Sequence, residues 1–352
     1  QDPDIQPLVW GGKGVGSHGD GSVQFLARSA EAQQQLIAYL NDRGMKAYPL
    51  TLKPVHTVRR AIIPVAGFGT RLYPATRALK KDFFPIPCPD GMVRPVILIL
   101  LEELVKSGIE EICLVLGSEE ERQQYADYFE RPLSDEHLRK LNPEAQEYEN
   151  RILDIGKRLH YVYQREKRGF GHAVYQAAQF ARNEPVLLLL GDTIYRSDSN
   201  KPCALQLIEE YERYNSLMVS IHSIPLSDVS HYGILHGVWE DKDNTILNVD
   251  VMHEKPKSSY AEEFLGVRNK QGEKEYYSVF GQYILTPEVF AQLHEDIMQK
   301  EIDGDHVSEI ELTSALEAVR QRSGMMGVRL RGRMFDMGNP AALTRCVDEY
   351  AI

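Results

Sequence analysis

Residues 61–76 read AIIPVAGFGTRLYPAT, and this stretch determines the fold that we predict for the rest of the chain. Its first five residues, 61–65, form an apolar run of strand length, which is typical of a strand buried in a parallel sheet. Gly67 and Gly69 follow the run, and Arg71 comes two residues later. Glycines directly after a buried strand let backbone amides approach phosphate oxygens, and an arginine adds a fixed positive charge. The stretch therefore predicts a phosphate-binding loop at the end of a sheet strand.

Apolar runs alternate with helical patterns beyond this loop. The predicted strands are 61–65, 111–116, 159–163, 186–190 and 217–223, and the predicted helices are 96–107, 119–129, 134–156, 172–182 and 204–214. This alternation predicts a doubly wound, mostly parallel, Rossmann-like α/β sheet. After residue 223 the pattern predicts a small β-rich part, with a hairpin at 232–253 and strands at 276–285 and 325–331. Helices are predicted at 309–322 and at 340–350, and another has Pro287 in its first turn. We therefore divide the main domain, 58–352, into parts 58–223 and 224–352.

The first 57 residues differ in character and are predicted to form a short N-terminal α/β appendage. A glycine-rich loop is expected at 11–21, then a strand at 22–27, a helix at 30–42 and a strand at 45–52. This order resembles the C-terminal lobe of kinases of the galactokinase, homoserine kinase and mevalonate kinase superfamily. An unrelated N-terminal extension is the alternative. No kinase activity is expected, because the ATP-binding loop and the catalytic acid of that superfamily lie upstream of such a segment.

Length, charge and cysteine content limit the class of protein. The 352 residues suffice for two domains or for one large domain with an appendage. The net charge of −11 disfavours a nucleic-acid partner. The longest apolar stretch, 95–101, is much shorter than the roughly 18 residues that a membrane span needs, and no secretory signal is expected at the start. The four cysteines are widely spaced, which argues against a zinc site or a disulfide framework and predicts a cytoplasmic protein.

The run from Ala66 to Pro85 resembles the signature of sugar-1-phosphate nucleotidyltransferases, because a Gly-x-Gly-Thr-Arg core is followed by Lys81. Matching blocks follow in the order of that family at 164–173, 191–192, 254–256, 281–283, 309–313 and 336–338. Ala66 and the long helical insert at 130–158 make the chain most similar to the bacterial UTP:glucose-1-phosphate uridylyltransferases. The resemblance spans about 60–350. It implies an enzyme that forms a nucleoside-diphosphate sugar and pyrophosphate from UTP and a sugar 1-phosphate, with Mg²⁺ as cofactor.

The resemblance also implies a set of site residues. The nucleotide-binding residues are Ala66, Gly67, Gly69, Thr70, Gln164 and Gly169; the sugar-phosphate-binding residues are Glu254, Lys255 and Gly281; the metal ligands are Asp192 and Asp336; the catalytic residues are Arg71, Lys81 and Lys255. The residues themselves suit these roles. Asp192 follows an apolar strand, and a carboxylate at that edge of a parallel sheet faces the ligand crevice, where Mg²⁺ binds one or two carboxylates plus phosphates. Gln164 offers one donor and one acceptor to a pyrimidine edge. His172 is expected to pack beneath the loop rather than to act as a base.

Some positions depart from the family pattern. Arg77 and Lys80 stand where a lysine and a proline are usual, Asp82 replaces a glutamate, and 88–94 contains extra residues. Because of these departures, one alternative is that the chain is a non-catalytic sugar-nucleotide-binding or regulatory module. Because of the appendage, a second alternative is that the chain is the pyrophosphorylase half of a kinase-pyrophosphorylase fusion that acts on another sugar. A nicotinamide-dependent dehydrogenase is disfavoured, since Leu72 stands where the third glycine of a dinucleotide loop is needed. The choice between UTP and dTTP, the identity of the sugar, and a homo-oligomeric state stay open.

Overall fold

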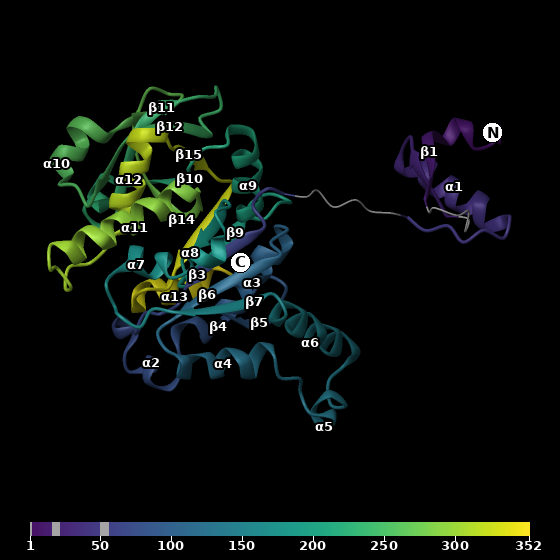
Figure 1. Cartoon of the computed structure of the whole chain (residues 1–352), viewed down its shortest axis with the longest axis horizontal. Coiled ribbons are helices and arrows are strands. Elements are labelled where there is room, and N and C mark those ends of the chain that lie inside the picture. The colour runs from purple at the N-terminus through teal and green to yellow at the C-terminus, as the bar shows by residue number, and fades with distance from the viewer. Residues whose placement is uncertain (1, 16–21, 50–55) are drawn as a thin grey trace. The chain divides into compact units, whose positions relative to one another are not determined.

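The computed structural model describes residues 2–15, 22–49 and 56–352. The chain forms two compact units, Gln1–Val55 and His56–Ile352 (Figure 1). In the N-terminal unit, strand β1 (Val9–Val15) pairs antiparallel with β2 (Ser22–Ala27), and helix α1 (Ala30–Asp42) buries Leu36 and Leu40. The helix begins at an N-cap, where the Ser29 hydroxyl accepts a hydrogen bond from the Ala32 amide at 3.1 Å. The predicted strand 22–27 and helix 30–42 are therefore confirmed.

Two other predictions for this unit were wrong. Residues 11–15 form part of β1 instead of a loop, because Gly12 leaves room for the Phe25 ring, which would lie 2.7 Å from a Cβ atom at that position. Residues 45–49 are not a strand, because the backbone turns back over the end of α1 and the Met45 amide donates to the Leu40 carbonyl. The remaining parts of these two predictions, 16–21 and 50–52, lie outside the described residues.

The second unit, which we call the main unit, is built on one large mixed sheet. Its strands are β3 (Arg60–Pro64), β6 (Glu111–Leu116), β7 (Leu159–Tyr163), β8 (Val186–Leu189), β10 (Met218–Ile224), β11 (Gly233–Trp239), β12 (Ile246–Glu254), β13 (Val267–Arg268), β14 (Lys274–Leu285) and β15 (Met326–Arg329). Their order is β10-β15-β12-β11-β14-β8-β3-β6-β7, with β13 paired to β14.

Four neighbouring strands, β8, β3, β6 and β7, are parallel, as the alternating pattern predicts. Strand β14 then pairs antiparallel with β8, so the predicted parallel unit at 217–223 does not continue this parallel region. That strand, β10, instead pairs antiparallel with β14 and parallel with β15. Most residues of β14 are buried, which suits an interior position in the sheet better than an edge.

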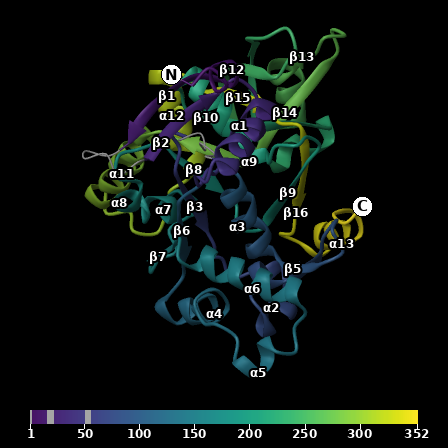
Figure 2. The ribbon, with the colours of Figure 1, turned by 90° about the vertical axis from the view of Figure 1, so that its right-hand side faces the viewer.

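Helices cover both faces of the sheet, as a doubly wound fold requires. One apolar core contains residues of α3 (Val96–Lys106), α4 (Glu119–Phe129), α6 (Pro143–Gly156), α9 (Cys203–Tyr214) and α13 (Pro340–Glu349). The other contains residues of α7 (Phe170–Tyr175), α8 (Ala178–Ala181), α11 (Pro287–Ile302) and α12 (Leu312–Ser323). Ile62 and Ile63 of β3 enter opposite cores, because successive strand residues point to opposite faces. In both views α4 and α6 lie at the end of the unit away from β12 and β15 (Figures 1 and 2).

Three predicted helices are shorter than expected. The region 134–156 is divided into α5 (Asp135–Leu138) and α6, because Pro143 starts a new helix that Asn142 caps through its side chain. The region 172–182 is divided into α7 and α8. Helix α12 begins at Leu312 instead of residue 309, because the preceding residues are extended and hydrogen-bond to the turn after β7.

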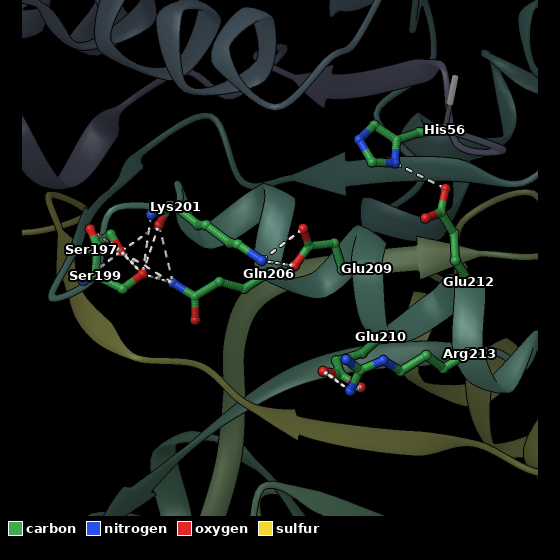
Figure 3. A network of polar contacts seen from close by, with 9 residues as sticks. All are labelled: His56, Ser197, Ser199, Lys201, Gln206, Glu209, Glu210, Glu212 and Arg213. Carbon is green, nitrogen blue, oxygen red and sulfur yellow. Dashed lines mark hydrogen bonds and ion pairs between the residues drawn. The ribbon is translucent and has the colours of Figure 1, made fainter. Parts of the chain in front are cut away.

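Polar contacts on α9 anchor the segment that follows β9 (Thr193–Ser197), a strand paired with β16 (Gly332–Asp336) (Figure 3). The Gln206 amide donates to Ser197 Oγ at 3.1 Å, and Lys201 forms an ion pair with Glu209 at 2.7 Å. Farther along the helix, Glu212 lies 2.9 Å from His56 Nδ1. Within the described parts of the chain, no helix has the length and apolar character of a membrane span.

Candidate active site

A cavity of about 430 Å³ lies at the edge of the sheet where β3, β7 and β8 end. It is lined by Pro64, Ala66, Gly67, Phe68, Lys81, Gln164, Lys167, Gly169, Phe170, Ala173, Leu190, Gly191, Asp192 and Glu309. These strands are parallel, so their carboxyl ends meet at one edge, which is where open α/β sheets bind ligands. Six predicted site residues therefore share this cavity: Ala66, Gly67, Lys81, Gln164, Gly169 and Asp192.

The loop after β3 forms one wall of the cavity. The Val65 amide donates to the Val115 carbonyl at 2.9 Å, which ties the start of the loop to the neighbouring strand. Gly69 has a φ of +63°, and a Cβ atom there would lie 2.9 Å from Thr76 Cγ2, so this turn requires glycine. Thr70 and Arg71 follow in a short 3₁₀ helix, Thr70–Leu72, and both are exposed. Gly69, Thr70 and Arg71 do not line the cavity itself.

Lys81 and Asp192 form an ion pair in the cavity wall. Lys81 Nζ lies 2.7 Å from Asp192 Oδ2, and the two side chains are 19% and 29% exposed. Gly191 lets the ends of β3 and β8 lie close together, because a Cβ atom at that position would lie 2.7 Å from the Pro64 carbonyl oxygen. The ion pair therefore places one cation and one carboxylate where the ends of β3 and β8 converge.

Asp336 lies beside this ion pair. It ends β16 opposite Thr193, and the Met337 amide donates to the Asp192 carbonyl at 2.9 Å. Burial raises the pKa of Asp336, and the negative charge of Asp192 raises it further, while the Gly338 amide, Lys81 and Arg71 lower it. The structure brings together the two predicted metal ligands and one of the three predicted catalytic residues, Lys81.

The two aspartates suit Mg²⁺. A Cβ atom built on Gly338 would lie 3.0 Å from Asp336 Oδ1 and 3.7 Å from Asp192 Oδ2, so both carboxylates border one small space. Across residues 2–15, 22–49 and 56–352, no three His, Cys, Asp or Glu side chains gather as a metal site. Mg²⁺ is commonly held by one or two carboxylates, with water and substrate phosphates completing its octahedron. A two-carboxylate pair therefore fits this cation better than a metal that needs three or four protein ligands.

Gln164 and Gly169 form the turn on the β7 side of the cavity. The Gln164 amide nitrogen Nε2 donates to the Gly169 carbonyl at 2.9 Å and also lies 3.3 Å from His172 Nδ1. These bonds engage Nε2, so Oε1 is the side-chain atom of Gln164 that could accept from a ligand. Gly169 has a φ of +94°, and the Gly171 amide donates to the Ile310 carbonyl at 2.8 Å. The segment before α12 therefore holds this turn in place, and His172 packs beneath it.

The predicted sugar-phosphate residues lie outside the cavity lining. Lys255 is 61% exposed, has a φ of +44°, and forms an ion pair with Glu254 at 3.2 Å. The other Glu254 oxygen accepts from Thr313 Oγ1 at 3.3 Å. Gly281 is closer to the charged group, because its carbonyl accepts from the Leu190 amide at 3.3 Å and from the Tyr195 hydroxyl at 2.8 Å. Of these three residues, only Gly281 adjoins the segment that carries Asp192.

Sequence reasoning missed two charged residues of the cavity, Lys167 and Glu309. Lys167 lies three residues after Gln164 in the same turn, and its Nζ donates to the Ala66 carbonyl at 2.7 Å. Its position in the same turn as Gln164 was the signal that could have placed it in the cavity. Glu309 belongs to the block 309–313, but nothing in its local sequence shows that it returns to the turn after β7. That approach depends on the Ile310 amide donating to the Arg168 carbonyl at 2.8 Å.

The structure shows the contacts of the residues that depart from the family pattern. Arg77 is exposed on the short helix α2 (Ala75–Ala78), whereas Asp82 is fully buried and accepts from the Tyr125 hydroxyl at 2.6 Å. Burial raises the pKa of Asp82, and the positive charge of Lys80 opposes that rise. The extra residues 88–94 form the tip between strands β4 (Pro85–Pro87) and β5 (Val93–Pro95), where Arg94 binds Asp90.

The fold and this site define a nucleotidyltransferase, and comparison with known proteins agrees. The family profile described as "Nucleotidyl transferase" matches residues 60–351. The chain belongs to this family and is an enzyme of the nucleotidyltransferase class, as the resemblance predicted. The N-terminal unit, Gln1–Val55, lies entirely outside the matched range.

Within the family, the chain is similar to UTP–glucose-1-phosphate uridylyltransferases. It is 31% identical to that of Streptococcus pneumoniae over 297 residues, which cover 84% of this chain and 91% of that protein. It is 32% identical to that of Staphylococcus epidermidis over 300 residues, covering 84% and 93%. A solved apo UDP-glucose pyrophosphorylase is 25% identical, with a TM-score of 0.67, over 83% of this chain and 98% of that one. UTP-bound UGPase from Acinetobacter baumannii shares the fold, with a TM-score of 0.64 at 23% identity over 83% and 93%.

Proposed function

We propose that this enzyme transfers the uridylyl group of UTP to a sugar 1-phosphate, with glucose 1-phosphate as the first choice, and releases pyrophosphate. The names of the related proteins support the choice of UTP and glucose 1-phosphate. The single observation that carries the proposal is the Lys81–Asp192 ion pair in the cavity wall, with Asp336 beside it. A cation for phosphate and carboxylates for a metal at one place suit a reaction between two polyanions.

The proposed reaction is one in-line displacement. A phosphate oxygen of the sugar 1-phosphate attacks the α-phosphorus of UTP, and the bond from that phosphorus to the leaving pyrophosphate breaks. The attacking oxygen is already ionised at neutral pH, so no general base is needed. Catalysis then depends on positioning the two substrates and on balancing the charge of their phosphates. This requirement matches a site whose side chains are mainly charged.

Each cationic side chain has a proposed role. Lys81 stabilises the charge at the α-phosphate, and Arg71 stabilises the leaving pyrophosphate. Lys255 binds the phosphate of the incoming sugar, which requires it to exchange Glu254 for that phosphate. Glu254 would then accept hydrogen bonds from sugar hydroxyls. On this assignment, residues 58–223 supply most of the nucleotide contacts and residues 224–352 the sugar contacts.

Asp192 and Asp336 are the residues that would hold Mg²⁺. When bound, Mg²⁺ would neutralise phosphate charge and orient the triphosphate. The backbone contact between the Met337 amide and the Asp192 carbonyl supports this assignment, because it couples the two segments that carry the carboxylates.

Gln164 is proposed to select the base. Its Nε2 is engaged with the Gly169 carbonyl, so its Oε1 can accept the N3–H of a uracil or thymine ring. The N3 atom of cytosine is itself an acceptor and would face this oxygen without a hydrogen bond. The site should therefore accept UTP and dTTP and reject CTP.

The test is a panel of sugar 1-phosphates crossed with nucleoside triphosphates, assayed for pyrophosphate with Mg²⁺ present. We expect the fastest release with UTP and glucose 1-phosphate, slower release with dTTP, and little with CTP. Lys140→Ala is a suitable control variant, because Lys140 is exposed and pairs only with Glu136 among the described residues. The absence of pyrophosphate release with every pair of substrates would refute the proposed function.

A further inference from the structure

Two lysines from different segments bind two successive carbonyls of the loop after β3. Lys80 Nζ donates to the Val65 carbonyl at 3.3 Å, and Lys167 Nζ donates to the Ala66 carbonyl at 2.7 Å. Lys80 precedes the short 3₁₀ helix Lys81–Phe83, and Lys167 lies in the turn after β7. The beginning of the loop is therefore held from two directions.

Glu121 balances much of this positive charge. Its Oε2 lies 2.7 Å from Lys80 Nζ and also accepts from the Gly117 amide at 3.0 Å. The side chains of Lys80 and Glu121 are 20% and 29% exposed, so solvent screens this ion pair less than a surface pair. Burial lowers the pKa of Lys167, and the charge of Glu121 opposes that effect. One carboxylate on α4 thus helps to keep two ammonium groups beside the loop.

We propose that Lys167 and Lys80 are positioning residues for the nucleotide: they fix and polarise the two peptide groups that precede Gly67. In a trans peptide, the carbonyl and the following N–H point in opposite directions, so fixing the Ala66 carbonyl fixes the direction of the Gly67 amide. A cation on the carbonyl also polarises the peptide and strengthens its N–H as a donor. The Gly67 amide is then prepared to bind an anionic oxygen. This inference rests on the proposed function, in which a nucleoside triphosphate is the ligand of the loop.

The surroundings of the loop support a positioning role. Gly67 lines the cavity, and Lys81 Nζ is the nearest atom to the place of a Cβ on Gly67, at 3.9 Å. Lys167 also lies over the Phe68 ring, 5.1 Å from its centroid, which restricts the side chain further. Lys80 stands where the family usually has proline, which has no side-chain donor. The contact with the Val65 carbonyl is therefore a feature that Lys80 adds to the usual pattern.

The first test needs no nucleotide. Hydrogen exchange of the Val65 amide, which donates to the Val115 carbonyl at the start of the loop, would be compared in the ligand-free full chain, in Lys167→Met and Lys80→Met, and in the control Lys140→Met. We expect roughly tenfold faster exchange in Lys167→Met and a smaller increase in Lys80→Met, because a hydrogen bond from a charged donor is lost. Lys167→Arg should restore part of the protection. Unchanged exchange in both methionine variants would overturn the proposal.

The second test measures nucleotide binding and turnover. We expect the Kd and KM for UTP to rise roughly tenfold in Lys167→Met while kcat stays within about threefold, with partial rescue in Lys167→Arg. A fall in kcat at unchanged KM would contradict a positioning role in binding. If Lys167→Met lowers the melting temperature, the Lys167→Arg variant separates a loss of folding from a loss of positioning. Wild-type stability with wild-type UTP binding in Lys167→Arg supports the proposal. Weak UTP binding in a Lys167→Arg variant of wild-type stability overturns it.

The two proposals fail in different ways. If the wild-type protein releases no pyrophosphate from any pair of substrates, the proposed function is wrong, yet the exchange comparison still tests the two lysines. If pyrophosphate is released normally by Lys167→Met at every UTP concentration and the exchange is unchanged, the positioning role is wrong while the proposed function stands.

Discussion

Replacing Lys81 with alanine tests the centre of the proposed mechanism. The substitution removes the ammonium that lies 2.7 Å from Asp192 and leaves Asp192 and Asp336 with one fewer neighbouring cation. Because Lys81 is only 19% exposed, water replaces its charge poorly. Loss of one preorganised transition-state donor typically costs roughly 10²–10³ in kcat, which is about 2.7–4 kcal/mol. We expect a loss of that size in Lys81→Ala, with a smaller change in the KM for UTP.

The assay is steady-state pyrophosphate release at saturating UTP and glucose 1-phosphate, with thermal unfolding as the check on folding. Lys140→Ala is the matched control, since it removes an exposed lysine and should keep wild-type turnover. Lys81→Arg should recover only part of the rate, because a planar guanidinium does not reproduce the geometry of an ammonium. A kcat in folded Lys81→Ala within about threefold of the wild type would refute the role that we assign to this residue.

Three further predictions concern the turn, the core and the metal. Gly169→Ala should raise the KM for UTP at least tenfold in a kinetic assay, because the φ of +94° suits only glycine and the new Cβ would lie 2.8 Å from the Ile310 carbonyl; an unchanged KM would contradict this. Burial lowers the pKa of His222 to about 4 from its ordinary 6.5. As the pH falls, the unfolded chain therefore binds a proton at this histidine before the folded chain does. About 3 kcal/mol of unfolding free energy is lost between pH 6.5 and pH 4. Urea unfolding at several pH values should show a smaller loss in His222→Leu, and an equal loss would disprove the idea. A chelator should abolish turnover and Mg²⁺ restore it, with Asp192→Asn needing at least tenfold more Mg²⁺; identical Mg²⁺ titrations would exclude Asp192 as a ligand.

Much of the main unit could be predicted because its signals are local. The apolar run 61–65 and its glycines indicated a buried strand and a tight loop, and both are present. The division of 134–156 also had a local signal, since Asn142 and Pro143 form a typical helix start that the helical periodicity concealed. The position of β14 between β8 and β11 had no such signal, because strand order depends on contacts between segments far apart in the chain.

In the candidate site, too, residues with a local signal could be predicted, whereas contacts between distant segments could not. Asp192 could be predicted, since a carboxylate after an apolar strand of a parallel sheet lies at the ligand-binding edge. The closeness of Asp336 followed only from the family resemblance, and the contact of Lys167 with Ala66 was not foreseen. The resemblance of residues 1–57 to a kinase lobe stays a prediction.

By itself, the sequence determined the class of fold, the position of the glycine loop after β3 and the need for glycine at its tight turn, because strand periodicity and backbone conformation depend on neighbouring residues. Only the tertiary structure decided which charges share the cavity. Lys81 meets Asp192 across 111 positions of sequence, and Lys167 meets Ala66 across 101. Such pairs form because the chain buries its apolar strands side by side, and the order of those strands is a property of the whole packed unit.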